Sequence, residues 1–323
     1  MFLSVALCTY NGARFIEEQL LSILNQQLPV GEIVIRDDAS SDETLPIVLA
    51  IAKAHPEIIW DIKQNPERVG VTKNFEKSLM ECHGDIVFLS DQDDVWLPEK
   101  TERMVAYLQS HPKVNLLFTN AELIDENGQR LSAWTLFDQC GFTDVLDAWD
   151  AGLQFEVETA AQRLLGATFA IRKQFLLKCI PFYPEIGSYH DGQLAMQSVV
   201  DQCNGRLDEC LTLYRIHSNN VVGLGGNAEG RLTRKVVLYD WNSLLEPWSV
   251  KPFFLLPCAN PIRPRVRFYI KRREQYSSCI GKFILAISLI SYIKYYNRFW
   301  ARFYFSDLLY GIPGRLRQKW VLL

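Results

Sequence analysis

The stretch of sequence that decides the fold spans residues 85–98 and reads DIVFLSDQDDVWLP. Its first five residues are nearly all apolar and rich in β-branched and aromatic side chains, a pattern typical of a strand buried on both faces of a parallel α/β sheet. Three carboxylates, those of Asp91, Asp93 and Asp94, follow at the carboxyl end of the strand, where open α/β sheets bind ligands. Because like charges this close repel one another, the cluster indicates a divalent cation with oxygen ligands. A solvated turn that caps the next helix is the alternative.

The composition is that of a globular protein with an uneven distribution of charge. The chain has 323 residues, 48% hydrophobic and 22% charged, which excludes wholesale disorder. This length leaves room for one large α/β domain with an appendage or for two modest domains. The net charge is −3, but the residues from 231 onward carry 17 Lys or Arg against 4 Asp or Glu, and the first 230 carry 17 against 33. A basic part joined to an acidic body indicates two roles, one of them at an anionic surface.

Cysteine usage and apolar runs bear on the cellular compartment. The eight cysteines form no C-x-x-C pair and no zinc-binding spacing, so we expect free thiols in a reducing cytosol. The N-terminus has neither the basic nor the apolar region of a signal peptide. The longest strongly apolar stretch, Phe283–Ile293, is shorter than the roughly 20 residues that a spanning helix needs. We therefore expect a cytoplasmic protein without a conventional spanning segment.

The order of the predicted elements specifies the first half of the sheet. Apolar runs predict strands at 2–7, 32–36, 58–62 and 86–89, and a polar loop and a helix follow each of the first three. This alternation predicts a parallel, doubly wound sheet. The later elements are expected in this order: a helix at 98–109, a strand at 114–119, a hairpin region at 120–129, irregular acceptor-side loops at 134–162, a strand at 166–172, helices at 173–179 and 193–201, a strand at 207–213 and a glycine-rich linker at 223–230.

The loops after these strands together resemble a known family. Residues 4–12 (SVALCTYNG), 37–42 (DDASSD) and 90–98 (SDQDDVWLP) are similar, in order and spacing, to the successive signatures of family 2 glycosyltransferases. The DQDDVW form, with the pair His190-Asp191 and the segment 214–223 (YRIHSNNVVG), resembles the bacterial rhamnosyltransferase-like branch. The resemblance covers about two-thirds of the chain. Any one motif would be weak, but five in sequence order are specific.

The resemblance implies the GT-A fold, a nucleotide-sugar-binding α/β fold with a mostly parallel sheet flanked by helices. It implies a catalytic domain at 1–224, followed by an extension at 225–323 whose sequence is helical, basic and aromatic. It also implies inverting transfer of one sugar, with rhamnose as the leading candidate, from a dTDP- or UDP-sugar to a glycan or lipid-linked acceptor in bacterial surface polysaccharide synthesis. No nucleic acid partner is implied. Two readings of the extension stay open: helices held peripherally at an anionic inner membrane face, and ordinary helices packed on the catalytic domain.

The resemblance also assigns roles to individual residues. Those expected to hold the nucleotide sugar, with Asp38 at the base, are Thr9, Tyr10, Asn11, Asp38, Lys73, Asn74, Asp91 and Arg215. Asp91 and Asp93 match the family's Asp-x-Asp, and Asp94 is an equal candidate as a ligand of the Mg²⁺ or Mn²⁺ that stabilises the leaving diphosphate. For His217 three readings are open: a metal ligand, a phosphate contact or a structural histidine. Arg215 is expected to offer charge to the same phosphate.

The last motif supplies the candidate general base. Asp191 matches the family's acidic residue that accepts the proton of the acceptor hydroxyl, and a helix cap is the alternative. The family more often has Glu before this Asp, whereas this chain has His190, which could orient Asp191, tune it or touch the acceptor. Two other functions stay open. A nucleotidyltransferase is disfavoured because residues 8–12 form no Gly-rich triphosphate loop. A non-catalytic sugar-nucleotide-binding protein is disfavoured by the retained acids Asp91, Asp93 and Asp191.

Overall fold

The computed structural model describes residues 1–143, 146–152, 154, 158, 163–183 and 189–217. The segment 218–323, which contains the predicted linker, the basic extension and the end of the last motif, lies outside the described residues. Residues 1–152 and the described part of 163–217 belong to one compact unit. Within the described part, no helix is both long enough and apolar enough to span a membrane.

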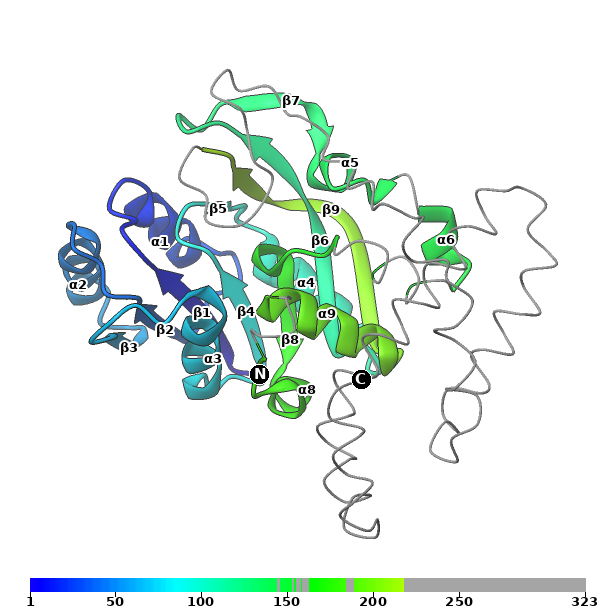
Figure 1. The fold of residues 1–323 in the computed structure, drawn as a ribbon, viewed down its shortest axis with the longest axis horizontal. Coiled ribbons are helices and arrows are strands. Elements are labelled where there is room, and N and C mark those ends of the chain that lie inside the picture. Colours follow the sequence, from blue (N-terminus) through cyan, green and yellow to red (C-terminus); the bar gives the residue numbers. More distant parts are fainter. Residues whose placement is uncertain (144–145, 153, 155–157, 159–162, 184–188, 218–323) are drawn as a thin grey trace, which may run out of the picture. The chain divides into compact units, whose positions relative to one another are not determined.

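Four parallel strands form the first half of the sheet, in the order β3, β2, β1, β4 (Figure 1). They are β1 (Leu3–Thr9), β2 (Glu32–Asp37), β3 (Ile59–Gln64) and β4 (Ile86–Ser90). Every residue of β1, β2 and β4 is buried, because each of these strands lies between two others and has helices on its faces. Near-continuous apolar runs suit such positions, and the predicted strands and their parallel order are confirmed.

Helices cover both faces of this parallel half. They are α1 (Ile16–Leu24), α2 (Thr44–Ala54), α3 (Val71–Glu81) and α4 (Lys100–Ser110). α1 and α4 contribute to the main hydrophobic core on the face to which Val5 and Leu7 point. Successive side chains of a strand point to opposite faces, so Ala6 lies on the other face, where α3 packs against β1 and β2. The carboxyl edge of the sheet is left to the loops between these elements.

The second half of the sheet is mixed rather than parallel. Its strands are β5 (Val95–Trp96), β6 (Leu116–Ile124), β7 (Arg130–Thr135), β8 (Phe169–Arg172) and β9 (Asn204–Arg215). From β4 the sheet continues through β8, β6 and β9 to β5, with β7 paired to β6. β8 is antiparallel to both β4 and β6, whereas β9 is parallel to β6. The remaining helices described are α5 (Leu136–Gln139), α6 (Leu146–Asp150), α8 (Lys173–Cys179), α9 (His190–Val200) and the 3-10 helix η2 (Gly166–Thr168).

Three details differ from the sequence-based expectation. β6 continues to Ile124 and forms a hairpin with β7, with Gly128 in the turn at a φ of 81°. The region 134–162, expected as irregular loops, contains the end of β7 and the helices α5 and α6. α9 begins three residues earlier than expected, so His190 and Asp191 lie in the first turn of a helix and not in the preceding loop. The N-terminus of α9 thereby carries both residues into the site.

Candidate active site

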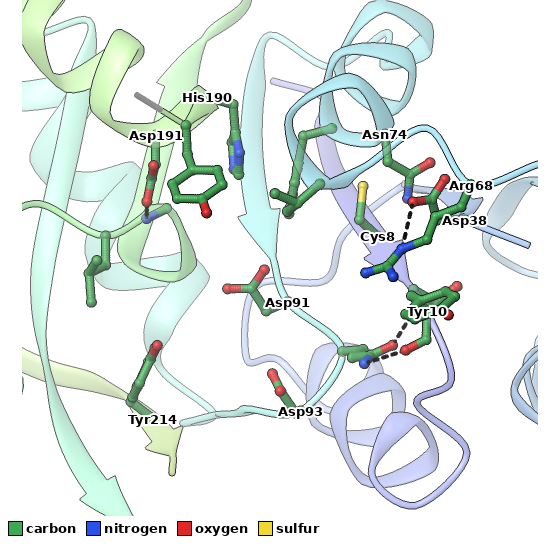
Figure 2. Close-up of a pocket in the computed structure, with 17 residues that line it drawn as sticks. Cys8, Tyr10, Asp38, Arg68, Asn74, Asp91, Asp93, His190, Asp191 and Tyr214 are labelled. Carbon is green, nitrogen blue, oxygen red and sulfur yellow. Dashed lines mark hydrogen bonds and ion pairs between the residues drawn. The ribbon is translucent and has the colours of Figure 1, made fainter. Parts of the chain in front are cut away.

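One pocket gathers most of the motif residues at the carboxyl edge of the parallel strands (Figure 2). The space inside it, including the part open to solvent, is ≈ 970 Å³. Seven of the predicted site residues line it: Thr9, Tyr10, Asp38, Asn74, Asp91, Asp93 and Asp191. The predicted site residues that do not line it are Asn11, Lys73, Asp94, Arg215 and His217. His190, which the sequence singled out beside Asp191, also lines it. The lining residues that the sequence did not single out as site residues are Cys8, Arg68, Val71, Phe75, Gln92, Leu165, Gly166, Tyr189 and Tyr214.

Asp38 is a buried carboxylate held by the turn between β3 and α3. Its Oδ1 accepts hydrogen bonds from Asn65 Nδ2 at 3.0 Å and from the Val69 backbone N–H at 2.7 Å. Its Oδ2 accepts one from the Gly70 N–H at 2.9 Å. Gly70 has a φ of 85°, which glycine adopts without strain, and this lets the turn aim its N–H groups at the carboxylate. Asn74 joins the same network, because its Oδ1 accepts a hydrogen bond from Asn65 at 2.8 Å.

The guanidinium of Arg68 lies over the ring of Tyr10, beside the carboxylate of Asp38. The guanidinium carbon of Arg68 lies 4.0 Å from the centroid of the Tyr10 ring, and its Nε lies 4.0 Å from Asp38 Oδ2 (Figure 2). Gln92 fixes the Tyr10 backbone from both sides, since its Oε1 accepts from the Tyr10 N–H and its Nε2 donates to the Tyr10 carbonyl. A planar stack next to a carboxylate suits a heteroaromatic base. Arg68 was missed, although it lies in a turn that the sequence marks clearly.

Two residues predicted to bind the nucleotide sugar, Thr9 and Asn11, form hydrogen bonds that hold the loops around the pocket. The hydroxyl of Thr9, which lines the pocket, donates to Asp37 Oδ1 at 2.7 Å. Asn11 does not line the pocket, because its backbone N–H donates to Ser40 Oγ and its Oδ1 accepts from the Ser41 N–H. Asn11 has a φ of 47°, a conformation that Asn tolerates better than most residues. It therefore joins the loops after β1 and β2 rather than facing a ligand.

The acidic centre of the pocket consists of Asp91 and Asp93, at the end of β4. Burial, helped by the negative charges of Asp93 and Asp191, raises the pKa of Asp91 to about 7. Asp93 Oδ2 lies 2.9 Å from Nε2 of His217, and both of these side chains are largely buried. The half-buried carboxylates of Asp91 and Asp93 and the imidazole of His217 are ligand types that Mg²⁺ or Mn²⁺ accepts. The described residues contain no group of three Asp, Glu, His or Cys side chains that already converge as metal ligands, so further ligands would come from the substrate or water.

Asp94, the third acid of the cluster, points away from the pocket. Its Oδ1 accepts a hydrogen bond from the Arg215 backbone N–H at 3.0 Å. Its Oδ2 is buried and finds no hydrogen-bond partner within the described residues. Burial, with the nearby charges of Asp93 and Asp91, raises the pKa of Asp94 well above its usual value. Asp94 therefore ties the acidic loop to the end of β9, and Asp91 and Asp93 are the acids that face a ligand.

A buried lysine lies behind the acidic cluster. Lys100 is fully buried at the start of α4, and its Nζ donates to the Ala167 carbonyl and to Thr212 Oγ1, each at 2.8 Å. Burial lowers the pKa of Lys100 to about 7, against the opposing charges of Asp94 and Asp91. The sequence held a signal for it, since Lys100 shares the helical spacing of the buried residues four and eight positions further along α4.

Asp191 lies in the first turn of α9, on the side of the pocket away from Tyr10 and Arg68 (Figure 2). Its Oδ1 accepts from the Gly192 N–H at 2.8 Å and its Oδ2 from the Gly166 N–H at 3.3 Å. These two backbone N–H groups fix the orientation of the carboxylate. A Cβ on Gly166 would lie only 3.2 Å from Asp191 Cβ and 3.3 Å from His190 Nε2, which explains a glycine at this position.

Lys73, predicted to lie near the sugar donor, instead joins α3 to the loop after α8. Its Nζ donates to Glu76 Oε1 at 2.9 Å and to the Phe182 carbonyl at 2.9 Å. It does not line the pocket, because these contacts turn its ammonium toward the loop after α8. Phe75, on the same helix, does line the pocket and stacks on His190. α3 thus supports the wall of the site, although its lysine faces away from it.

Arg215, predicted to bind a phosphate, is a buried clamp outside the pocket. It is only 1% exposed. Its Nε–H donates to the Asp93 carbonyl at 2.7 Å, its Nη1 to the Asp125 carbonyl at 3.2 Å and its Nη2 to Glu18 Oε2 at 2.6 Å. The guanidinium also lies 4.8 Å from the centroid of the Phe15 ring. With these partners the side chain joins α1, the acidic loop and the β6–β7 hairpin.

The comparisons with known proteins agree with this geometry. A family model described as Glycosyl transferase family 2 matches residues 4–176, more than half of the chain. The chain belongs to glycosyltransferase family 2. The stretch matched by this family 2 model contains Tyr10 and Arg68 and the acidic centre of the pocket, and it ends before Asp191.

Relatives of the family 2 chain include proteins of named and of unknown activity. The dTDP-rhamnosyl transferase RfbG of Shigella flexneri is 29% identical over 229 residues, which make up 67% of this chain and 73% of RfbG. The uncharacterized protein Rv1520 of Mycobacterium tuberculosis is 26% identical over 225 residues, 68% of this chain and 60% of that protein. The match thus spans about three-fifths of the mycobacterial relative.

Solved structures with the same arrangement are glycosyltransferases. TarS residues 1–349 of S. aureus, in complex with UDP-GlcNAc, has a TM-score of 0.52 at 22% identity, over 69% of this chain and 62% of that one. The mannosyltransferase PcManGT of Pyrobaculum calidifontis, in complex with GDP-Man and Mn²⁺, has a TM-score of 0.50 at 20% identity, over 68% and 58%. At such identities the likeness shows the fold, and the expected GT-A fold is confirmed.

Proposed function

We propose that this family 2 chain transfers one sugar from a nucleoside diphosphate sugar to a hydroxyl acceptor, with inversion at the anomeric carbon. The observation that carries the proposal is a single pocket with three chemically distinct parts. A nucleoside end surrounds Tyr10 and Arg68, the half-buried carboxylates of Asp91 and Asp93 follow, and the separate carboxylate of Asp191 lies beyond (Figure 2). This is the order in which a donor presents its base, its diphosphate and its anomeric carbon.

The acidic centre is the proposed metal site. Asp91 and Asp93 would hold Mg²⁺ or Mn²⁺, with the imidazole of His217 beside Asp93. When bound, such an ion stabilises the negative charge that develops on the leaving diphosphate. The support is the burial of like charges in the pocket and the Mn²⁺ named with the mannosyltransferase PcManGT. Asp94 has a supporting role, because Arg215 holds it outside the pocket.

Asp191 is the proposed general base. The N–H groups of Gly166 and Gly192 orient its carboxylate. The acceptor proton moves to a carboxylate oxygen of Asp191 as the acceptor oxygen bonds to the anomeric carbon and the bond to the diphosphate breaks. Of the acids lining the described pocket, Asp191 is the one that neither the acidic centre nor the nucleoside end uses. A single carboxylate on the acceptor side suits direct displacement and therefore inversion.

The identity of the sugar is a finer part of the proposal. Rhamnose from a dTDP donor is the leading candidate, because RfbG is a dTDP-rhamnosyl transferase and because Val71, Phe75 and Leu165 give the pocket an apolar wall. Such a wall suits the methyl group of a 6-deoxy sugar. The acceptor would be a glycan or lipid-linked glycan of a bacterial surface polysaccharide, and residues 1–224 would form the catalytic domain, working in the cytoplasm.

A screen of purified protein against a panel of nucleotide sugars tests the proposal. We expect thermal stabilisation by one donor with Mn²⁺ or Mg²⁺ present, and less with a chelator. Release of free nucleoside diphosphate should require an acceptor, which separates transfer from nucleotidyl transfer and from mere binding. Asp191→Asn should keep donor binding and lose most turnover, because an amide accepts the hydroxyl proton poorly. Turnover of that variant within a few-fold of wild type would place the base elsewhere.

The basic extension, which lies outside the described residues, is proposed as a peripheral membrane contact. Basic residues near an anionic surface contribute about 1 kcal/mol each, so several of them would hold the protein reversibly and in a salt-sensitive way. Full-length protein should co-sediment with anionic vesicles at low salt, whereas a chain ending near residue 226 should not. Equal partitioning of the two would contradict this role.

A further inference from the structure

His190 is a buried and uncharged imidazole in the wall of the pocket. It is 5% exposed, and its ring stacks on Phe75 with centroids 3.9 Å apart and planes inclined by 17°. Phe182 packs against it at a centroid distance of 6.3 Å. Burial lowers the pKa of His190 to about 4, although the charge of Asp191 opposes the shift, so the ring is neutral at neutral pH. A phenylalanine at position 190 would stack on Phe75 as well as histidine does. Stacking therefore does not explain why the ring at this position carries nitrogen atoms.

The two ring nitrogens of His190 have different surroundings. Nδ1 is buried and has no hydrogen-bond partner within the described residues. Nε2 lies beside Gly166, which also lines the pocket, and a Cβ added there would come within 3.3 Å of it. A buried N–H without an acceptor is rarer than a buried lone pair without a donor, so we place the proton on Nε2. Nε2–H is then a donor directed at the pocket, with its stack holding it in place.

The position of His190 indicates which part of a ligand it meets. Figure 2 shows the ring between Asp191 and the nucleoside end, across the pocket from Asp91. In the proposed function the base lies at Tyr10, the diphosphate at Asp91 and Asp93, and the acceptor hydroxyl approaches Asp191. The part of the ligand next to Asp191, and therefore next to its neighbour His190 in α9, is the sugar that is transferred. The two rings that pack against His190, those of Phe75 and Phe182, are apolar, so the imidazole is a directional polar group beside an apolar surface.

We propose that His190 Nε2–H donates a hydrogen bond to a hydroxyl oxygen of the transferred sugar and thereby helps to select that sugar. The inference rests on the proposed function and names a specificity contact within the same site. A site that hydrogen-bonds one hydroxyl discriminates strongly against analogues that lack it, because its buried donor is then left unpaired. A neutral donor also leaves Asp191 as the group that takes the acceptor proton.

Three substitutions and two ligands test this contact. His190→Phe keeps an aromatic ring on Phe75 and removes both nitrogens, His190→Gln places an amide N–H near the position of Nε2, and His190→Asn places one near Nδ1. For each variant, Kd is measured by calorimetry with Mn²⁺, once for the nucleotide sugar identified by the screen and once for the corresponding nucleoside diphosphate without sugar.

We expect His190→Phe and His190→Asn to weaken nucleotide-sugar binding about five- to twentyfold, the loss of one hydrogen bond, and His190→Gln to bind within about threefold of wild type. The affinity for the nucleoside diphosphate should stay within about twofold in all three, which also reports an intact nucleoside end. Equal weakening of both ligands, or Phe binding the nucleotide sugar better than Gln, would overturn the inference in favour of a phosphate contact or a stacking role. Failure of the wild-type protein to bind any nucleotide sugar would instead overturn the proposed function itself.

Discussion

Replacing Gly166 by Ala should lower turnover with only a modest loss of stability. An ideal Cβ at this position lies 3.2 Å from Asp191 Cβ, 3.3 Å from His190 Nε2 and 3.4 Å from Leu89 Cδ2. Ordinary contacts of a Cβ begin at 3.4 Å, so the neighbouring side chains must move by a few tenths of an ångström. The Gly166 N–H also holds Asp191 Oδ2, so the movement falls on the proposed base.

Stability and catalysis respond differently to such a displacement. Overpacking costs about 1–2 kcal/mol, and the reduced entropy of the unfolded chain returns about 0.4–1 kcal/mol, so the free energy of unfolding falls by roughly 0–1.5 kcal/mol. For a unit of this size that lowers Tm by at most about 6 °C. A misplacement of 1 Å can cost about a hundredfold in rate, so a few tenths should lower kcat roughly three- to tenfold.

Steady-state kinetics and thermal unfolding of Gly166→Ala measure the two effects side by side. Gly152→Ala is the matched control, because Gly152 has a φ of 83° and no atom within 4 Å of its ideal Cβ. Alanine is strained there by about 1–2 kcal/mol, so the control loses stability but should keep kcat. The reasoning fails if Gly166→Ala retains kcat within twofold of wild type, or if the control loses as much activity.

The remaining predictions concern charge. Asp93→Asn, and to a lesser degree Asp91→Asn, should raise the Mn²⁺ concentration for half-maximal turnover about tenfold or more with the fold intact, and unchanged metal dependence of both would remove the metal assignment. Because burial holds the pKa of His190 at about 4, below its ordinary 6.5, the unfolded state binds more protons between these values, and stability is lost as the pH falls through that window. Urea unfolding should therefore show wild type losing roughly 2 kcal/mol more than His190→Phe between pH 7.5 and pH 5, and parallel pH profiles would contradict this. Arg215→Lys cannot keep all three hydrogen bonds of the guanidinium and should lower the free energy of unfolding by about 2–4 kcal/mol, whereas Arg14→Lys, an exposed arginine over the same Phe15 ring, should change it by less than about 0.5 kcal/mol. Equal losses of unfolding free energy in the two arginine variants would show that the hydrogen bonds of the Arg215 guanidinium add no stability.

The parallel half of the fold was predictable because three of its four strands, β1, β2 and β4, lie between two others. Strands such as β1 and β4 are buried on both faces, so their sequences are apolar without interruption and their limits are easy to read. The carboxyl ends of neighbouring parallel strands share one edge, which is why Thr9, Asp38 and Asp91 meet in one pocket as expected. The mixed half was not predictable in this way, because the antiparallel pairing of β8 with β4 joins segments some 80 residues apart and leaves no local signal.

Two of the predicted site residues that do not line the pocket, Lys73 and Arg215, share one physical reason. A motif fixes a residue's place in the chain, but the direction of a long charged side chain depends on partners that the motif does not contain. Arg215 turns toward Glu18, 197 residues away, and Lys73 turns toward Phe182, 109 residues away. The side chain of Asp191 is shorter, and it lies where the first turn of α9 puts it. Arg68 was missed for the converse reason, since it reaches Tyr10 from a turn with no motif of its own.

The Arg215 clamp has a consequence for the order in which the protein matures during synthesis. Its guanidinium holds the carbonyl of Asp93, yet it is made 122 residues later than that carbonyl. At about 5–20 residues per second, roughly 6–25 s separate the two on the ribosome. Through that interval a nascent chain can pair β1, β2 and β4 and close the turn around Asp38, but its acidic loop has no anchor. The growing polypeptide therefore completes the part of the pocket proposed for the nucleoside before the part proposed for the cation.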